Sequence, residues 1–131
     1  MQIDGYLLDT NTIIDIAAGS SQLGEKTKNL IAQARNLYYS PVSIAELEIK
    51  SMLGKLPKMH ALFERLSQQD FKELPLFSTH SLEISRFGQL IGHDPFDRLL
   101  LSQASSENLG LITRDRKLVE LKVPWVIDAS E

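Results

Sequence analysis

Short apolar runs alternate with helical patterns along most of this chain, and this alternation restricts its fold more than any other feature. Runs that read as strands cover about residues 6–9, 37–40, 71–76, 109–113 and 125–127. Helical patterns separate these runs, which is typical of right-handed βαβ crossovers and of a parallel sheet covered on both faces. The sequence therefore predicts an α/β fold around a short parallel sheet.

Helices are expected between the strands, and one of them carries two specific signals. The predicted helices cover about residues 10–18, 24–36, 43–53, 59–66, 80–91, 95–108 and 115–121. Ser43 and Glu46 match the S-x-x-E pattern of a capping box, which indicates a helix start. A spacing of i, i+4, i+7 and i+8 predicts a buried apolar stripe on the same helix, formed by Ala45, Ile49, Met52 and Leu53.

Composition limits the class of protein. The chain has 131 residues, which suits one domain over residues 1–131, and it has no cysteine, which excludes disulfides and thiolate zinc sites. We expect a cytoplasmic protein, because no apolar run approaches the roughly 20 residues that span a bilayer and acids interrupt the N-terminal apolar stretch. The formal net charge of −3 argues against a broad nucleic-acid-coating surface. Any contact with RNA must therefore come from a local basic patch.

Five acids lie where strands end or helices begin: Asp9, Glu46, Asp94, Asp97 and Asp115. In a parallel α/β sheet the ligand crevice lies at the carboxyl ends of the strands, where the following helices start. Clustered carboxylates raise one another's pKa unless a cation neutralises them, and oxygen ligands suit Mg²⁺ or Mn²⁺. The pattern therefore predicts a metal-dependent phosphoryl-transfer enzyme, and a nuclease in particular.

Each of these acids also has a purely structural interpretation. A capping box and an ion pair with Lys50 would explain Glu46. Helix capping and the helix dipole would explain Asp94, Asp97 and Asp115. We favour the metal site because caps occur at any helix, whereas these acids share one edge of the predicted sheet.

Basic residues and histidines carry weaker signals. Four basic residues near the acids suit either local charge balance or contact with an RNA phosphate, and the sequence leaves both open: Lys50, Arg98, Arg114 and Arg116. Three histidines show no metal-ligand spacing and are expected at the surface or as helix caps: His60, His80 and His93. The chain also lacks the GxSxG, GxxxxGK[ST] and GxGxxG patterns, which argues against serine hydrolases and the usual nucleotide-binding folds.

Four segments carry a resemblance to a known family: LLDTNTIID, SIAELEIKSMLGKL, HDPFDRLLLSQA and LITRDRKL. In their order and spacing the chain resembles PIN-domain ribonucleases, and VapC-like toxins of toxin–antitoxin pairs in particular, over about residues 5–127. The resemblance implies a three-layer α/β/α fold and a Mg²⁺- or Mn²⁺-dependent endoribonuclease that cleaves RNA, often tRNA or rRNA. It also implies a homodimer that is inhibited by a cognate antitoxin.

The family's four acids match four positions of this chain, and the resemblance assigns catalysis and metal binding to them: Asp9, Glu46, Asp97 and Asp115. Asp94 is an extra acid that the resemblance makes auxiliary. Thr10, Asn11 and Thr113 suit hydrogen bonds that orient the acids.

Three different functions compete with that of a toxin. A receiver domain matches the size, fold and Mg²⁺ use, but it needs paired acids after the first strand and a lysine after the fifth. The segments LLDTN and PWVIDASE offer neither. A non-catalytic PIN module is the second possibility, and four intact acids argue against it. A housekeeping RNA-processing nuclease is the third.

Overall fold

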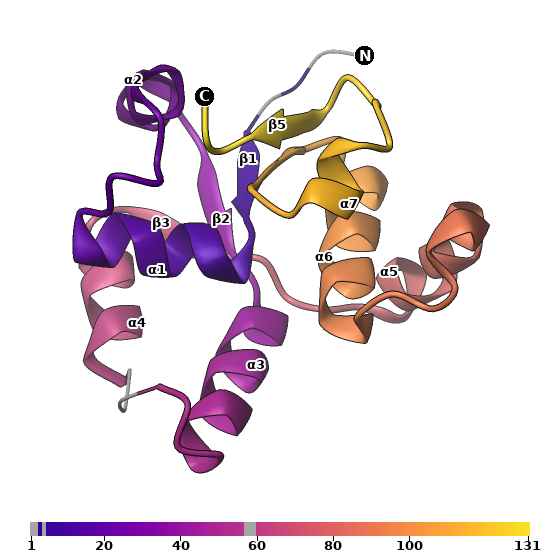
Figure 1. The fold of residues 1–131 in the computed structure, drawn as a ribbon, viewed down its shortest axis with the longest axis horizontal. Helices are drawn as coiled ribbons and strands as arrows, with labels where there is room; N and C mark the ends of the chain where they lie inside the picture. The colour runs from indigo at the N-terminus through magenta and orange to yellow at the C-terminus, as the bar shows by residue number, and fades with distance from the viewer. Residues whose placement is uncertain (1–2, 4, 57–59) are drawn as a thin grey trace.

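A five-stranded parallel sheet runs through the molecule in the order β3-β2-β1-β4-β5 (Figure 1). The computed structural model describes residues 3, 5–56 and 60–131. The strands are β1 (Tyr6–Leu8), β2 (Leu37–Tyr39), β3 (Phe71–Glu73), β4 (Gly110–Thr113) and β5 (Val126–Asp128). The predicted α/β fold on a parallel sheet is therefore confirmed.

Helices cover both faces of this sheet, which makes three layers (Figure 1). They are α1 (Thr10–Ala18), α2 (Glu25–Gln33), α3 (Pro41–Met52), α4 (His60–Gln68), α5 (Ser78–Leu82), the 3₁₀ segment η1 (Glu83–Leu90), α6 (Pro95–Ser106) and α7 (Arg116–Val119). Among the described residues, no helix is both long and apolar enough to cross a bilayer.

The two central strands are buried on both faces. Leu7 and Leu111 pack into one apolar cluster, with α6 and η1, while Leu8 and Ile112 pack into the other, with α1 and α4. All four side chains are fully buried. Successive residues of a strand point to opposite faces, so a strand covered on both sides is apolar throughout. This explains why YLL and GLIT are clear strand signals in the sequence.

The start of α3 differs from the prediction. The helix begins at Pro41, and the side chain of Ser40 caps it by accepting a hydrogen bond from the backbone N–H of Val42 at 3.1 Å. The predicted capping box of Ser43 and Glu46 is therefore wrong. Proline at the first helical position fits because its ring fixes φ and its missing N–H would have had no helical partner. Ser43 instead accepts a hydrogen bond from the hydroxyl of Thr10 at 2.9 Å.

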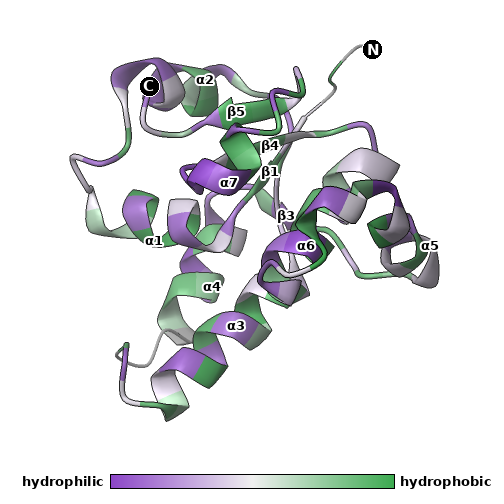
Figure 2. Ribbon diagram, turned by 45° about the vertical axis from the view of Figure 1, so that its right-hand side comes forward, coloured by the Kyte–Doolittle hydropathy of each residue, from purple (hydrophilic) through white to green (hydrophobic). Residues whose placement is uncertain are grey.

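The apolar stripe predicted on α3 is exposed, so that prediction is also wrong. Met52 is 86% exposed and Leu53 is 64% exposed. The helix extends away from the sheet (Figure 2), and within the described part of the chain nothing covers the apolar side chains at its far end. The buried residues of α3 lie on another face: Val42, Ser43, Glu46 and Leu47. Helical spacing identifies an apolar face but does not show that a partner covers it.

Two other helices differ from the prediction in their boundaries. The helix predicted over residues 80–91 is interrupted, because α5 passes into η1 and Phe87 has a non-helical backbone (φ −113°, ψ 52°). The helix predicted from residue 59 is α4, and residues 57–59 lie outside the described part of the chain. Neither change affects the sheet.

The strand order places a switch point between β1 and β4. The chain runs from β1 outward to β2 and β3, and then returns to β4 on the other side of β1. Asp9 follows β1 directly, and its backbone N–H donates to the carbonyl of Ile112 at 3.0 Å. Ligands of open α/β sheets bind at such a point, outside the carboxyl ends of the strands. The fold therefore places Asp9 at the edge of the sheet where a ligand is expected to bind.

Gln103 joins three segments beneath this edge, and we expect its removal to destabilise the fold. It is fully buried on α6, donates to the carbonyls of Leu74 and Pro75 at 3.1 and 3.3 Å, and accepts from the hydroxyl of Ser40. Gln103→Ala should lower the free energy of unfolding by about 2–4 kcal/mol, because buried groups lose their partners. Urea denaturation measures this. The exposed Gln89→Ala should change it by less than about 0.5 kcal/mol, and equal effects would contradict the prediction.

Candidate metal centre

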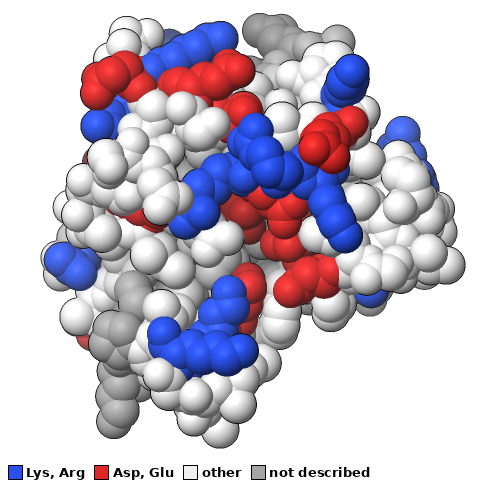
Figure 3. Space-filling model, viewed as in Figure 1, with Lys and Arg blue, Asp and Glu red and all other residues white. Residues whose placement is uncertain are grey.

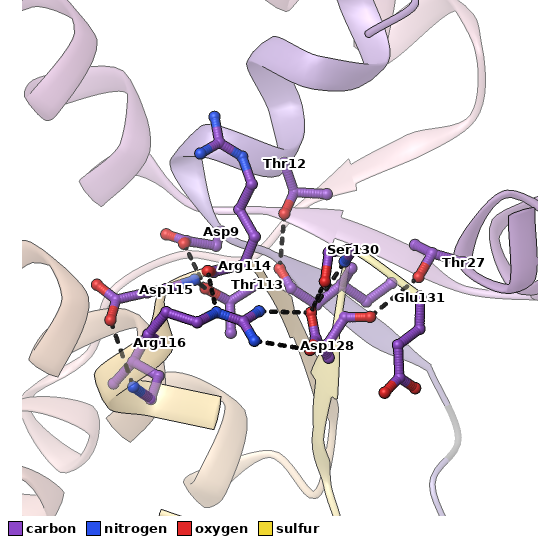
Figure 4. A network of polar contacts seen from close by, with 12 residues as sticks. Asp9, Thr12, Thr27, Thr113, Arg114, Asp115, Arg116, Asp128, Ser130 and Glu131 are labelled. Carbon is purple, nitrogen blue, oxygen red and sulfur yellow. Dashed lines mark hydrogen bonds and ion pairs between the residues drawn. The ribbon is translucent and has the colours of Figure 1, made fainter. Parts of the chain in front are cut away.

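Asp9 is a buried carboxylate held by the ends of two strands. It is 1% exposed, and its two oxygens accept hydrogen bonds from the backbone N–H of Thr10 and the hydroxyl of Thr113, each at 2.7 Å. The hydroxyl of Thr113 in turn accepts a hydrogen bond from the backbone N–H of Asp115 at 3.0 Å (Figure 4). Thr113, at the end of β4, therefore fixes Asp9 and the start of the next loop together.

Burial raises the pKa of Asp9 to about 6, from an ordinary value of 3.8. The hydrogen bonds from Thr113 and Thr10 oppose this change, and the negative charges of Glu46 and Asp115 add to it. A carboxylate in this setting is costly to ionise unless a cation lies beside it.

Glu46 reaches the same cluster from α3. Glu46 is 6% exposed, and one of its carboxylate oxygens, Oε2, pairs with the ammonium of Lys50 at 3.0 Å. Among the described residues, the other oxygen, Oε1, is buried without a hydrogen-bond partner. The ion pair that the sequence suggested is present, yet half of this carboxylate is left for another ligand.

Asp97 and Asp115 complete the cluster, and a histidine lies between them. Asp97 is on the first turn of α6, and Asp115 caps α7 by accepting from the backbone N–H groups of Lys117 and Leu118. His93 Nε2 lies 3.1 Å from Asp97 Oδ2 and 3.3 Å from Asp115 Oδ2. Burial, followed by the charges of nearby acids, holds the pKa of Asp97 well above its ordinary value.

The structure thus brings together the four acids expected to form the site, while their catalytic roles stay predictions. Asp94 is exposed and caps α6 by accepting from the backbone N–H of Phe96 at 2.8 Å, and its charge also acts on Asp97; its auxiliary role stays a prediction. Thr113 donates to Asp9 from its hydroxyl, whereas Thr10 donates to Asp9 from its backbone N–H and to Ser43 from its hydroxyl; that these residues orient the acids stays a prediction. Asn11 lies one residue further along α1 and is half-buried.

The expectation for the histidines was wrong in one respect that matters. His93 is not a surface residue, because its side chain is 12% exposed and contacts two of the acids. His80 is also buried, at 1% exposure, although it does serve as a cap by accepting from the backbone N–H of Phe77. The side chain of His60 lies outside the described part of the structure. A spacing of four residues between His93 and Asp97, one helical turn, was the signal available in the sequence.

A group of three residues, which we call the C-terminal clasp, ties β5 to the loop that carries Asp115. The guanidinium of Arg116 donates to both oxygens of Asp128 at 2.6 and 3.0 Å, and Ser130 donates to Asp128 from its backbone N–H and its hydroxyl (Figure 4). These hydrogen bonds, above all the one from Arg116, lower the pKa of Asp128 to about 2. The clasp restrains the position of Asp115, the neighbour of Arg116.

Lys and Arg side chains form a band across the central acidic patch (Figure 3). A groove of about 430 Å³ lies in this part of the molecule and is lined by Ser21, Gln22, Arg114, Arg116 and Ser130. Arg114 is held there by an ion pair of 2.7 Å with the buried Asp15. Positive charge thus lies beside the acids in spite of the negative net charge.

The donor set fits a divalent cation. Four carboxylates and an imidazole converge on one place, two of the carboxyl groups have raised pKa values, and one buried oxygen has no partner among the described residues. His93, Asp97 and Asp115 each offer one ligand atom, and these three atoms lie within 4.8 Å of one another. Carboxylate oxygens, with one imidazole nitrogen, are the ligands of Mg²⁺ and of first-row transition ions.

Fold and site together define an α/β protein with an acidic cluster at its switch point, whose side chains could hold a metal ion. More particularly, the chain belongs to the PIN-domain family, whose model matches residues 6–124. This membership excludes the receiver domain. No curated protein sequence matches the chain significantly.

Solved structures of toxin–antitoxin complexes share the fold. A toxin–antitoxin complex from Klebsiella pneumoniae matches with a TM-score of 0.65 and 20% identity, covering 95% of this chain and 98% of the other. VapBC2 from Rickettsia felis, bound to a promoter DNA fragment, matches with a TM-score of 0.63 and 19% identity, over 93% and 95%. FitAcB from Neisseria gonorrhoeae matches with a TM-score of 0.56 and 25% identity, over 84% and 87%. The predicted PIN-like α/β fold is confirmed by these matches.

The raised pKa values make the stability of the metal-free protein depend on pH. Asp9 and Asp97 lose their protons near pH 4 in the unfolded chain. In the folded protein they keep these protons to a higher pH, because their pKa values are raised. Their contribution is therefore most favourable at low pH and is lost as pH rises through the folded pKa values, which for Asp9 is about 6. Asp128, with a pKa of about 2, stays ionised across this range.

We expect the melting temperature in EDTA to fall between about pH 5 and pH 8, and Asp97→Asn to reduce this slope and to raise the melting temperature at pH 8. Thermal denaturation followed by circular dichroism measures both. Asp70→Asn makes the same chemical change in an exposed turn and should keep the wild-type slope. An unchanged slope in Asp97→Asn would contradict the prediction.

Proposed function

We propose that this chain is a metal-dependent endoribonuclease and the toxin of a toxin–antitoxin pair. One observation carries the proposal: Asp9, Glu46, Asp97 and Asp115 converge at the switch point of a PIN fold. The buried oxygen of Glu46 that has no partner among the described residues supports a cation at this place. Family membership and the likeness to proteins from toxin–antitoxin complexes support the toxin assignment.

The proposed reaction is hydrolysis of an RNA phosphodiester bond. A bound Mg²⁺ or Mn²⁺ would activate water and stabilise the charge that develops on the phosphate oxygens. We assign direct binding of the ion to Asp9 and Asp97, and binding of the ion or its waters to Glu46 and Asp115. Thr113 and the C-terminal clasp contribute by holding Asp9 and Asp115 in fixed orientations before substrate arrives.

We propose that RNA reaches the acids across the basic band. The groove lined by Arg114 and Arg116 lies beside Asp115, and Arg98 lies next to Asp97 on α6. Arg98 is half-buried, and within the proposal the exposed part of its guanidinium contacts a phosphate. Lys50 is engaged with Glu46 and would contact RNA from that position. Within the proposal, the RNA is a single strand presented in a loop, as in tRNA or rRNA, because unpaired bases and backbone are the parts of folded RNA that a protein surface can reach.

Exposed apolar side chains support the two proposed protein partners, a second copy of the chain and an antitoxin. One set lies on the far half of α3 and the other on the segment from residue 76 to residue 91: Ile49, Met52 and Leu53, and Leu76, Phe77, Leu82 and Ile91. Apolar surface of this kind marks interaction sites. We place the toxin, its antitoxin and its RNA in the cytoplasm.

We expect the purified chain to cleave RNA only with Mg²⁺ or Mn²⁺, and Asp9→Asn to lower the rate by about 100-fold or more. Metal-assisted charge stabilisation is worth several kcal/mol, and each 1.4 kcal/mol is about tenfold in rate. Gel assays on a tRNA pool, with and without EDTA, measure this. Asp70→Asn serves as the matched control and should cleave normally. Full activity in EDTA or in Asp9→Asn would contradict the proposal.

The toxin assignment has its own test. Expression of the chain alone should slow growth of the host, and co-expression of the neighbouring small gene should relieve this by forming a complex that covers the acids. Growth curves and pull-downs measure the two effects, with Asp9→Asn as the control that should not slow growth. If the wild-type chain cleaves RNA but leaves growth unchanged, a housekeeping RNA-processing nuclease becomes the better assignment.

A further inference from the structure

The position of His93 is not explained by the acids alone. The residue lies in the turn before α6, and its side chain is more buried than the two carboxylates that it contacts: 12% of it is exposed, against 15% for Asp97 and 21% for Asp115. One atom, Nε2, faces both carboxylates, at 3.1 and 3.3 Å. A single ring nitrogen has only one proton or one lone pair to offer, so it does not make two good hydrogen bonds at once.

These separations match those of neighbouring ligands around one ion. Two ligand atoms at right angles in an octahedron, each about 2.1 Å from the ion, lie about 3 Å apart. The three ligand atoms of His93, Asp97 and Asp115 lie within 4.8 Å of one another, close enough for a single ion to contact all three. Independently, Oε1 of Glu46, an acid whose charge acts on Asp9, is buried without a partner among the described residues and is free to accept a cation.

We propose that His93 is a direct nitrogen ligand of the catalytic ion and that the site therefore prefers a first-row transition ion such as Mn²⁺ to Mg²⁺. This inference rests on the proposed function, because it assumes that the acid cluster holds a metal. Mg²⁺ selects oxygen ligands and keeps several of its waters, whereas imidazole nitrogen binds transition ions more strongly. The four carboxylates alone would accept either ion, and the histidine changes the balance between them.

A different role for His93 would produce similar distances but opposite behaviour. In that role His93 would be positively charged and would replace the metal ion as the charge that neutralises Asp97 and Asp115. Removing a competing cation would strengthen the binding of every divalent ion, whereas removing a ligand weakens binding, and most of all for the ion that prefers nitrogen. The sign of the change therefore separates the two roles.

The experiment measures metal binding to the full chain without RNA. Wild type, His93→Gln and Asp97→Asn are titrated with Mn²⁺, with free Mn²⁺ followed by electron paramagnetic resonance, and Mg²⁺ affinity is obtained by competition. We expect His93→Gln to weaken Mn²⁺ binding by about tenfold or more and Mg²⁺ binding by less than about threefold. Unchanged or tighter Mn²⁺ binding, or an equal loss for both ions, would overturn the assignment of His93.

Asp97→Asn separates this inference from the proposed function. It should weaken both ions; if it weakens neither, the metal centre itself is refuted. If it weakens both while His93→Gln weakens neither, only the role of His93 is refuted.

A second measurement does not depend on a variant that folds. Electron spin echo spectra of Mn²⁺ bound to the wild-type chain should show the ¹⁴N coupling of a directly bound imidazole. Spectra without that coupling would overturn the proposal.

Discussion

Repulsion among carboxylates is the constraint on which the rest of this structure depends. Asp9, Glu46, Asp97 and Asp115 come from four separate segments, and in a metal-free protein burial, together with the charges of neighbouring acids, opposes the ionisation of Asp9 and Asp97. A framework that is rigid elsewhere must hold them. The fully buried strands β1 and β4 supply it, together with the hydroxyl of Thr113, which is bonded to two of the four segments. Stability given up at such a site is a common feature of functional centres.

Much of this arrangement could be predicted from the sequence, because the physics that produces it is local. Strands covered on both faces are continuous apolar runs, and the helices that follow them begin at the carboxyl edge of a parallel sheet. An acid that follows YLL or GLIT must therefore lie at that edge. These acids are far apart in the sequence, and the topology of the sheet brings Asp9 beside Asp97 and Asp115. The switch-point rule, more than any single residue, was the source of the prediction.

The parts that failed depend on tertiary context. Ser43 and Glu46 have the spacing of a capping box, but Pro41 starts the helix earlier and leaves Ser43 to meet Thr10. The apolar residues at the end of α3 have core spacing, yet no layer reaches them. His93 shows no ligand pattern with the other histidines, because its companions in the fold are carboxylates. In each case the local pattern is present in the sequence, but contacts with segments distant in sequence determine the structure that it adopts.

The C-terminal clasp has a consequence for how a protein of this kind can diverge. A continuous path of bonds runs from Asp128 on the last strand, through Arg116, to Asp115, and through Thr113 to the buried Asp9. A substitution on β5 can therefore shift the acidic residues without contacting them. A lineage can adjust the fine geometry of its site in this way while every acidic residue of the cluster is inherited unchanged.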